Sequence, residues 1–414
     1  MKQQNSDVVI VGGGMAGCAA AIRLARSGYS VTVLEKEAAY LDRVRGECMV
    51  QWGFEQAIAM GIADVLLATP GASFVTRLMG YDETMSLEIA QSRPHDVSQI
   101  VEGVPGLLCA GHVDMRETLA REAALAGAIV LRGVNHVEVV PGNRPKVSFE
   151  HEGISQKISA ALVLVADGKN SRIRKQLGIA LLSSGPRACI TGMLIDDGGM
   201  WDRAETTQGV FGENLIYIMP RGDNLSRLYV TRTVDNPNRF VGSGKEQRML
   251  DCLDVEGLPF GKELSQARPA GPCGSFIADD SWTPQPFAEG VVLMGDTAGW
   301  SNPVTGQGLA IALRDARIIT DLFLEAGGAW SSSLSRAYAA ERHERMGRLR
   351  YASALLDLIT AHGQEDRAIR RKRMFKRMHG NPTLGKALDA CHLGPWTVAE
   401  NAFAPSNLVE LAMA

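Results

Sequence analysis

The sequence predicts an α/β protein with α+β character, in which two domains are interleaved and a helical region follows them. Three observations support this prediction. Between residues 7 and 35 an apolar strand, a glycine-rich turn, a helix and a second strand follow one another. A strand-rich block spans 187–233, with alternation clearest at 225–233, and we assign it to a separate sheet. Residues 331–414 have the pattern of helices.

The composition is that of an ordinary enzyme. The chain has 414 residues, of which 45% are hydrophobic and 21% charged, and its net charge is −3. This charge gives no general attraction to nucleic acid, and no apolar run approaches the ~20 residues that span a bilayer. We expect a small-molecule substrate, no nucleic-acid partner and no membrane association. Few residues precede the strand at Asp7, so we also expect no secretion signal and a cytoplasmic location.

The elements can be placed in chain order. The opening unit comprises a strand at 8–11, a helix at 16–27 and a strand at 30–34, and helices follow at 53–60 and at 114–126, where Asp114 can act as the cap. A second group of segments predicts a meander and its continuation, with strands at 137–140, 146–150, 156–158, 162–166 and 291–294 and a long helix at 307–324. The seven cysteines are odd in number, scattered and without a CxxC pair, so we expect reduced thiols and no metal site.

Residues 12–17 fit the pattern GxGxxG between a strand and a helix. Gly12 allows the tight turn, Gly14 lets the backbone approach a pyrophosphate, and Gly17 permits close helix packing. Met15 and Ala16 begin a helix whose positive end favours phosphates. Glu35, with Lys36 beside it, ends the second strand, where a carboxylate accepts hydrogen bonds from a free ribose 2′-OH and repels a 2′-phosphate. The pattern therefore predicts bound FAD or NAD rather than NADP, and leaves the choice between those two open.

Two further motifs favour a flavin. Residues 166–174 are ADGKNSRIR, and residues 295–308 are GDTAGWSNPVTGQG. With these motifs the chain, from residue 7 to about 330, resembles the class A flavoprotein monooxygenases, the family of para-hydroxybenzoate hydroxylase. The resemblance implies that FAD is bound, that Asp167 and Gly168 serve the flavin and the nicotinamide cofactor, that Asp296 bonds the ribityl chain, and that Pro303 lies beside the isoalloxazine ring.

The end of the third motif has a physical interpretation as well. Gly306 and Gly308, with Gln307 and Leu309, begin a helix whose N–H groups can face N1 and the C2 carbonyl of the flavin. Reduced flavin carries negative charge there, so this helix end stabilises it. By resemblance, Arg45 and Arg116 approach the flavin and its phosphates. The alternatives are a solvated surface arginine for Arg45 and a helix-surface salt bridge for Arg116.

The resemblance also implies a domain plan. The Rossmann-type FAD-binding domain comprises 1–75, 100–182 and 272–330, and an interleaved antiparallel-sheet domain for the substrate comprises 76–99 and 183–271. The C-terminal helical region is 331–414. Within it, 367–377 is a basic amphipathic segment that could lie on a membrane or a partner, although we expect a solvated helix face balanced by acids elsewhere.

The implied activity is that of an FAD-dependent monooxygenase, which hydroxylates or epoxidises a small organic substrate, such as a secondary metabolite, through a flavin C4a-hydroperoxide. Molecular oxygen is then a co-substrate, and the electrons come from NAD(P)H or from reduced flavin supplied by a flavin reductase. Most hydroxylases of the family have His where this chain has Gly299, which is closer to geranylgeranyl reductases and flavin halogenases. A flavin-dependent reductase of isoprenoid double bonds, or a halogenase-like enzyme, is therefore the alternative.

The sequence assigns no catalytic residue, but it offers three candidates near the expected pocket between the flavin and the second sheet: Tyr217, His112 and Trp300. A strand tyrosine is more often a half-buried packing residue, and a lone histidine is usually structural. Cys48 lies close to Arg45 in the sequence, and we expect it to be a packed thiol.

Overall fold

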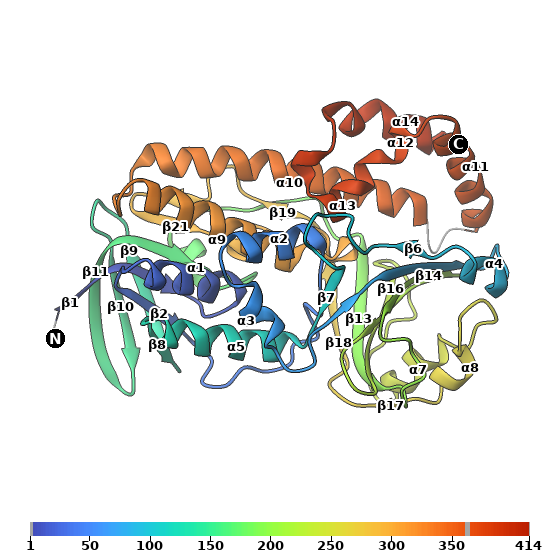
Figure 1. The fold of residues 1–414 in the computed structure, drawn as a ribbon, viewed down its shortest axis with the longest axis horizontal. Helices are drawn as coiled ribbons and strands as arrows, with labels where there is room; N and C mark the ends of the chain where they lie inside the picture. The colour runs from blue at the N-terminus through green and yellow to red at the C-terminus, as the bar shows by residue number, and fades with distance from the viewer. Residues whose placement is uncertain (1–2, 361–364, 414) are drawn as a thin grey trace.

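The computed structural model describes residues 3–360 and 365–413. Figure 1 shows a first sheet with its helices at one end, a second sheet at the other end, and a group of short helices above the second sheet. The first sheet has five parallel strands in the order β21-β11-β1-β2-β8. Their bounds are β1 Gln3–Val11, β2 Val31–Glu35, β8 Ile129–Arg132, β11 Ile154–Val165 and β21 Val291–Leu293.

Both faces of this sheet are covered, which explains its apolar strands. Val8 and Ile10 face a cluster that includes α1 (Met15–Arg26), α5 (His112–Leu125) and α9 (Gly308–Glu325). Val9 and Val11 face the opposite side, where β9 (Asn135–Val140) and β10 (Lys146–His151) form the predicted meander with β11. The remaining strand β20 (Phe287–Ala288) pairs antiparallel with β21 at the edge. The α/β prediction is confirmed.

The second sheet has the order β17-β13-β16-β15-β14-β5-β6, with β18 also paired to β13. Its strands are β5 Arg77–Asp82, β6 His95–Asp96, β13 Ala188–Asp196, β14 Glu205–Phe211, β15 Asn214–Pro220, β16 Leu225–Thr233, β17 Arg268–Pro269 and β18 Gly274–Ala278. All pairs are antiparallel except β5 with β14, because β5 enters from an earlier part of the chain. The strands β5 and β6 lie within 76–99, whereas β18 lies outside 183–271, and the domain limits stay a prediction.

Smaller elements connect the two sheets. A three-stranded sheet has the order β3-β7-β4, and β12 pairs with β19. The bounds are β3 Cys48–Met49, β4 Ser73–Val75, β7 Leu107–Cys109, β12 Leu182–Ser183, β19 Ser281–Trp282, α2 Gln51–Ala59, α3 Ala63–Leu67, α4 Leu87–Gln91, α6 Arg172–Gln176, α7 Lys245–Asp251 and α8 Gly261–Leu264. Two 3-10 turns, η1 Gly295–Ala298 and η2 Pro303–Thr305, precede α9.

The C-terminal region is helical, as predicted. It contains α10 Ser332–Thr360, α11 Arg367–Gly380, α12 Thr383–Lys386, α13 Ala390–Leu393, α14 Pro405–Ala412 and the 3-10 turns η3 Ala387–Asp389, η4 Pro395–Thr397 and η5 Glu400–Phe403. Met346 and Leu349 of α10 pack against Trp52 and the start of α9, and Leu355 joins the core of the short helices. Helix α10 therefore ties the C-terminal region to the helix that follows the third motif (Figure 1).

Two expected boundaries are wrong. Helix α5 begins at His112 after Gly111, and the carboxylate of Asp114 binds Arg221 at 3.1 Å instead of capping the helix. The segments 156–158 and 162–166 belong to one strand, β11, because β1 runs beside it in register from Gln3 to Val11. The partner strand extends β11, which short-range patterns do not report.

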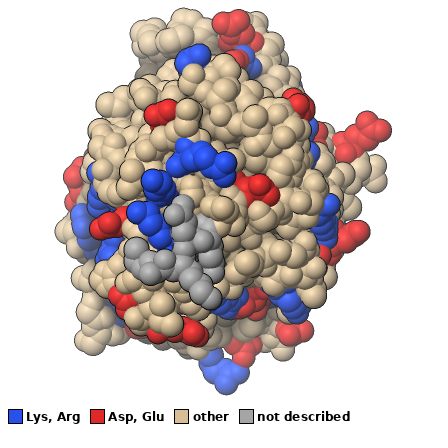
Figure 2. All heavy atoms as spheres, turned by 90° about the vertical axis from the view of Figure 1, so that its left-hand side faces the viewer, with Lys and Arg blue, Asp and Glu red and all other residues tan. Residues whose placement is uncertain are grey.

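Within 3–360 and 365–413, no helix combines the length and hydropathy needed to cross a bilayer. Figure 2 shows acidic and basic side chains interspersed over the end of the molecule that lies on the left in Figure 1. All seven cysteines are free thiols.

Candidate flavin site

The turn between β1 and α1 is shaped by steric limits at two glycines. Gly12 has φ +108°, and a Cβ there would lie 2.3 Å from the carbonyl oxygen of Ala166. A Cβ at Gly17 would lie 2.0 Å from the carbonyl oxygen of Gly12. Gly14, by contrast, faces open space and precedes α1 with no side-chain cap. The first N–H groups of α1, from Met15 on, are therefore available to an anion.

Glu35 and Arg116 lie together beside this turn. The buried Glu35 carboxylate accepts hydrogen bonds from the N–H of Gly13 at 2.7 Å and of Glu37 at 2.8 Å. Arg116 is buried too; its guanidinium lies 3.8 Å from the Glu35 carboxylate and 3.8 Å from the ring centroid of Tyr40. Arg116 also lies 3.3 Å from the Glu37 carboxylate, so it does form salt bridges, but they are buried and not at a helix surface. The side chain of Lys36 points to solvent.

The second and third motifs meet at Thr297, which the sequence analysis did not single out. The Thr297 hydroxyl donates to Asp167 at 3.2 Å and accepts from the N–H of Gly168 at 3.0 Å. Arg174 donates to the carbonyl of Thr297 at 3.0 Å. The third motif also reaches the first, since a Cβ on Gly295 would lie 3.7 Å from the Cβ of Ala16. The three motifs therefore converge, although more than 100 residues separate each from the next.

A buried ion pair holds the third motif in place. Asp315 of α9 accepts a hydrogen bond from the N–H of Gly295 at 2.8 Å and pairs with Arg342 of α10 at 2.9 Å. Arg342 also donates to the carbonyl oxygens of Gly295, Ala298 and Gly299, at 3.0, 3.0 and 2.8 Å. Burial opposes ionisation of Asp315, but Arg342 and Arg345 outweigh it and keep its pKa below the ordinary value. The sequence did not single out Asp315 or Arg342. The signal that could have indicated Asp315 is an acidic residue on the apolar face of α9.

Gly299 has a steric explanation that the resemblance did not supply. Its φ is +110°, and a Cβ there would lie 2.3 Å from the carbonyl oxygen of Ser281. Arg342 fixes the same backbone through the Gly299 carbonyl. In this loop a histidine could not replace the glycine without backbone movement. The departure from the hydroxylase pattern therefore reflects loop geometry and gives little information about the reaction.

Asp296 is the one acidic residue of the third motif. No described residue, in 3–360 or 365–413, donates a hydrogen bond to its carboxylate. Burial raises its pKa, while Arg45 and Lys169 favour the ionised form. The Arg45 side chain is exposed, and its guanidinium lies 5.5 Å from the ring centroid of Phe276. Asp296 thus offers an acceptor, with Arg45 as the cation on the same side.

A second glycine-containing turn lies at the start of α9. Pro303 begins η2, Gly306 has φ +68°, and a Cβ on Gly306 or Gly308 would meet nothing within 4 Å. Gln307 is buried; its side chain accepts a hydrogen bond from the Trp52 indole at 2.9 Å, so only its backbone can face a ligand. Leu309 is buried in the core of the first sheet.

Tyr217 lies beside this turn. Its hydroxyl donates to the carbonyl oxygen of Val304 at 3.0 Å, and burial raises its pKa above the ordinary value. It belongs to an apolar cluster that spans the loop before β3, the second sheet, η2 and α10, formed by Val44, Ala188, Ile190, Tyr217, Met219, Tyr229, Phe276, Ala278, Val304 and Leu356. The second sheet therefore contacts the third motif through this cluster.

The other two catalytic candidates have different surroundings. His112 packs against Gly46, where a Cβ would lie 2.8 Å from the imidazole Cδ2. Burial, with Arg116 and Arg45 nearby, lowers the pKa of His112 to about 4, so it is neutral at pH 7. Trp300 donates from its indole to Asp279 at 2.9 Å, and the ammonium of Lys169 lies 4.2 Å from its ring centroid. Both side chains have structural partners.

The loop that contains Arg45 is clamped to the second sheet by charges that sequence reasoning missed. Arg227 of β16 is fully buried and donates to Glu47 at 2.8 Å and to Asp42 at 2.8 Å. Arg221 lies 3.3 Å from the other Glu47 oxygen. Between these acids Val44 adopts a left-handed φ of +57°. The clamp therefore fixes the loop on which both Val44 and Arg45 approach the site.

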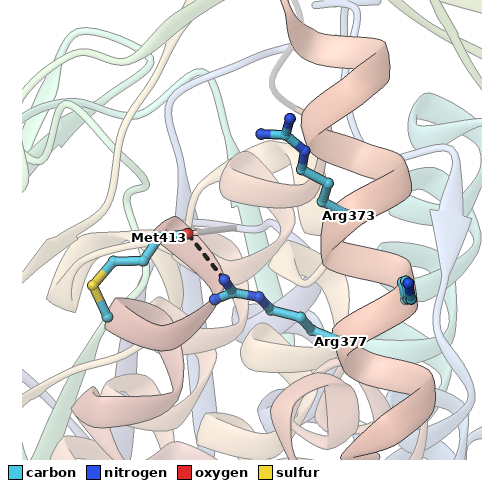
Figure 3. A pocket seen from close by; sticks show the side chains of 4 residues that line it. Arg373, Arg377 and Met413 are labelled. Atoms are coloured by element: carbon cyan, nitrogen blue, oxygen red, sulfur yellow. Dashed lines mark hydrogen bonds between the residues drawn. The ribbon is translucent and has the colours of Figure 1, made fainter.

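The basic segment 367–377 forms most of α11, and acids do balance part of it. Arg367 pairs with Glu83 at 3.0 Å, and Arg371 pairs with Glu83 at 3.2 Å. Arg377 donates to the carbonyl oxygen of Met413 at 3.0 Å (Figure 3). Arg373, Lys376, Arg377 and Met413 line a surface hollow of about 550 Å³. Helix α11 therefore packs Met374 into the core of the C-terminal helices, reaches Glu83 after β5 through its arginines, and leaves its other face to solvent.

The fold and the three converging motifs define a flavoprotein, and comparison with known proteins agrees. A family model described as an FAD binding domain matches residues 5–237, more than half of the chain, so the chain belongs to this family of FAD-dependent oxidoreductases, which includes monooxygenases. The predicted resemblance to class A flavoprotein monooxygenases is confirmed, and so is the prediction of an FAD-dependent enzyme.

Relatives at about 25% identity include a monooxygenase and a reductase, the two kinds of enzyme that the sequence analysis considered. Squalene monooxygenase from Rattus norvegicus is 25% identical over 320 residues, covering 75% of this chain and 53% of that protein, so this chain spans about half of its length. Digeranylgeranylglycerophospholipid reductase from Methanothrix thermoacetophila is 26% identical over 357 residues, covering 82% and 83%. The crystal structure of p-nitrophenol 4-monooxygenase from Pseudomonas putida DLL-E4 aligns with a TM-score of 0.76 at 17% identity, over 95% and 99% of the chains. That likeness shows the fold alone.

Removing Arg342 tests the ion pair. In Arg342→Ala the buried Asp315 keeps its pair with Arg345 at 2.5 Å. Asp315 still loses Arg342, and three backbone carbonyls lose a charged donor, so we expect a cost of about 3 kcal/mol of unfolding free energy. Urea unfolding of the apoprotein measures this cost. Arg336→Ala, an exposed arginine on the same helix, is the matched control and changes the unfolding free energy by less than about 0.5 kcal/mol. Equal unfolding curves for the two variants would contradict the role of Arg342.

The depressed pKa of His112 predicts a pH dependence of stability. The folded pKa of about 4 lies below the unfolded value of about 6.5, so the stabilisation is present above pH 6.5 and is lost as the pH falls toward 4. Wild type should lose up to about 3 kcal/mol more than His112→Gln between those limits. Urea unfolding at about pH 7 and pH 4.5 measures the difference; the exposed His343→Gln should follow wild type.

Proposed function

We propose that this chain holds FAD where its three motifs converge, and uses the reduced cofactor to hydroxylate or epoxidise an apolar organic substrate with molecular oxygen. The convergence is the observation that supports the proposal: Gly12 abuts Ala166, Gly295 abuts Ala16, and Thr297 bonds to Asp167. A Cβ built on Gly14 or on Gly308 would meet no described protein atom within 4 Å, which leaves the open space that a bound cofactor needs.

The residues fit the groups of FAD one by one. The N–H groups at the start of α1 would hold the diphosphate, and Glu35 would accept from the ribose hydroxyls with the lone pairs that its two backbone donors leave free. Asp296, which lacks a donor, would accept from the ribityl chain. The start of α9 would face N1 and the C2 carbonyl, where its dipole favours the anion of the reduced ring. When bound, reduced FAD supplies the oxygen activation.

The chain's own contribution is to orient the substrate and exclude water. The apolar cluster beside Val304 supports an apolar substrate, since Val44, Ile190 and Phe276 offer no hydrogen bonds to a polar one. Tyr217 fixes the backbone of this wall through the Val304 carbonyl. His112 is neutral at pH 7 and is an acceptor rather than an acid there. A dry, fixed wall limits wasteful loss of activated oxygen to water.

The electron supply belongs to the proposal as well. The chain contains one GxGxxG fingerprint, which the flavin would occupy. NAD(P)H would then bind transiently at the same flavin, or reduced flavin would come from a separate reductase as partner. A second candidate function, reduction of isoprenoid double bonds, is supported by the similarity to the archaeal reductase and needs the same apolar wall.

Two glycines separate cofactor binding from folding. Gly14→Ala should raise the FAD dissociation constant at least tenfold, because the new methyl enters the space proposed for the diphosphate, while the apoprotein loses less than about 1 kcal/mol. Gly12→Ala should destabilise the apoprotein by more than about 2 kcal/mol through its φ and the Ala166 clash. Flavin fluorescence titration and urea unfolding give both quantities. Unchanged FAD affinity in Gly14→Ala would contradict the proposed cradle.

Isotope labelling distinguishes the candidate reactions. The purified protein should be yellow, and with NAD(P)H or reduced flavin under 18O2 it should add one 18O atom to a substrate from a panel of phenols and isoprenoids. Oxygen-independent loss of a double bond under argon would favour the reductase. Bromide or chloride incorporation would favour the halogenase-like alternative. Boiled protein and protein stripped of flavin are the controls.

A further inference from the structure

Two thiols lie directly opposite each other in the small β3-β7-β4 sheet, which packs against the start of α9. Cys48 of β3 pairs with Cys109 of β7, and both thiols are free. The N–H of Ala110 donates to the carbonyl of Glu47 at 2.9 Å, so the adjoining pair 47 and 110 is hydrogen-bonded. Because the two kinds of pair alternate along antiparallel strands, Cys48 and Cys109 form a non-hydrogen-bonded pair. Such pairs have Cα atoms about 4.5 Å apart, within the range that a disulfide spans.

The surroundings of the two thiols overlap, but their exposure differs. The two side chains pack in the same cluster, and each belongs to the other's surroundings. The neighbouring Cys48 thiol and burial raise the pKa of Cys109 well above its ordinary value. Cys109 is fully buried, whereas Cys48 is half-buried, so a small oxidant reaches Cys48 first. Cys109 is then the neighbouring thiol that can resolve the oxidised sulfur.

The pair lies next to the site. Both cysteines pack in a cluster with Ala310 and Ile311 of the first turn of α9, the helix that would face the flavin. Cys48 also follows the clamped loop that contains Arg45, and Cys109 leads into the helix that begins at His112. A covalent bond here would join these two segments beside the cofactor.

We propose that Cys48 and Cys109 are a modification site, which hydrogen peroxide converts into an intramolecular disulfide. The Cys48 thiol takes up one peroxide oxygen to give the sulfenic acid and releases water. The Cys109 thiol then displaces hydroxide from that sulfur, so a sulfur–sulfur bond forms and a second water leaves. Two thiols are oxidised by one peroxide, which is reduced to two waters. Peroxide is the product when a flavin oxygenase turns over without its substrate, but the proposal does not depend on the proposed function.

The test uses the full-length protein and added hydrogen peroxide. We expect the intact mass to fall by about 2 Da and a cross-linked peptide that contains Cys48 and Cys109 to appear. When the protein is then unfolded in denaturant, Ellman's reagent should count five reactive thiols in place of seven. Dithiothreitol should reverse all three changes. Because only added peroxide is used, the result is independent of whether any substrate is oxygenated.

Matched variants assign the bond. Cys252→Ser, which removes another half-buried thiol, should behave as wild type. Cys48→Ser should lose the mass change, and Cys109→Ser should gain a sulfenic acid that dimedone traps at Cys48. Peptide mapping of wild type decides the matter even if Cys109→Ser fails to fold. Seven reactive thiols after peroxide treatment, or a disulfide that excludes Cys48 or Cys109, would overturn the proposal.

Discussion

The third motif depends on a buried cluster in which Asp315 pairs with Arg342 and Arg345, and on the hydrogen bonds that Asp315 and Arg342 make to the motif. Asp315 accepts from one end of the third motif, and Arg342 donates to three of its backbone carbonyls. A loop with left-handed residues such as Gly299 does not keep its shape by local preference alone. Helices α9 and α10 therefore hold the backbone of residues 295–299 in place through Asp315 and Arg342.

A second set of buried charges serves the opposite side of the site. Arg227 bonds to Glu47 and Asp42, which holds the loop with Val44 and Arg45 against the second sheet. The sheet accommodates the loop, since a Cβ on Gly192 would lie 2.4 Å from Val44. Breaking such a pair is costly because a buried charge is left alone. Val44 of the apolar cluster and the exposed Arg45 thus share one anchor, which under the proposed function would couple the positions of substrate and cofactor.

Much of the fold and the cofactor site could be predicted because their signals are local. The run Val8–Val11, the glycines after it and the third motif each specify a turn by their own residues. The clamps could not be predicted in the same way. Arg342 is one of several arginines on α10, and only packing against α9 decides which is buried. Arg227 follows the ordinary alternation of β16, and its partner Glu47 lies 180 residues away, outside that sheet, so no local pattern joins the two.

The same geometry bears on the choice between oxygenation and reduction. Gly299 first suggested the reductases, yet the backbone at that position excludes any side chain, so the residue reports the loop and not the reaction. What differs between the chemistries is the partner of the reduced flavin: oxygen in one, an alkene in the other. Both need an apolar wall, and Val44, Tyr217 and Val304 provide it. The reaction is therefore decided by which electron acceptor this wall admits beside the flavin, and the flavin-binding motifs are common to both.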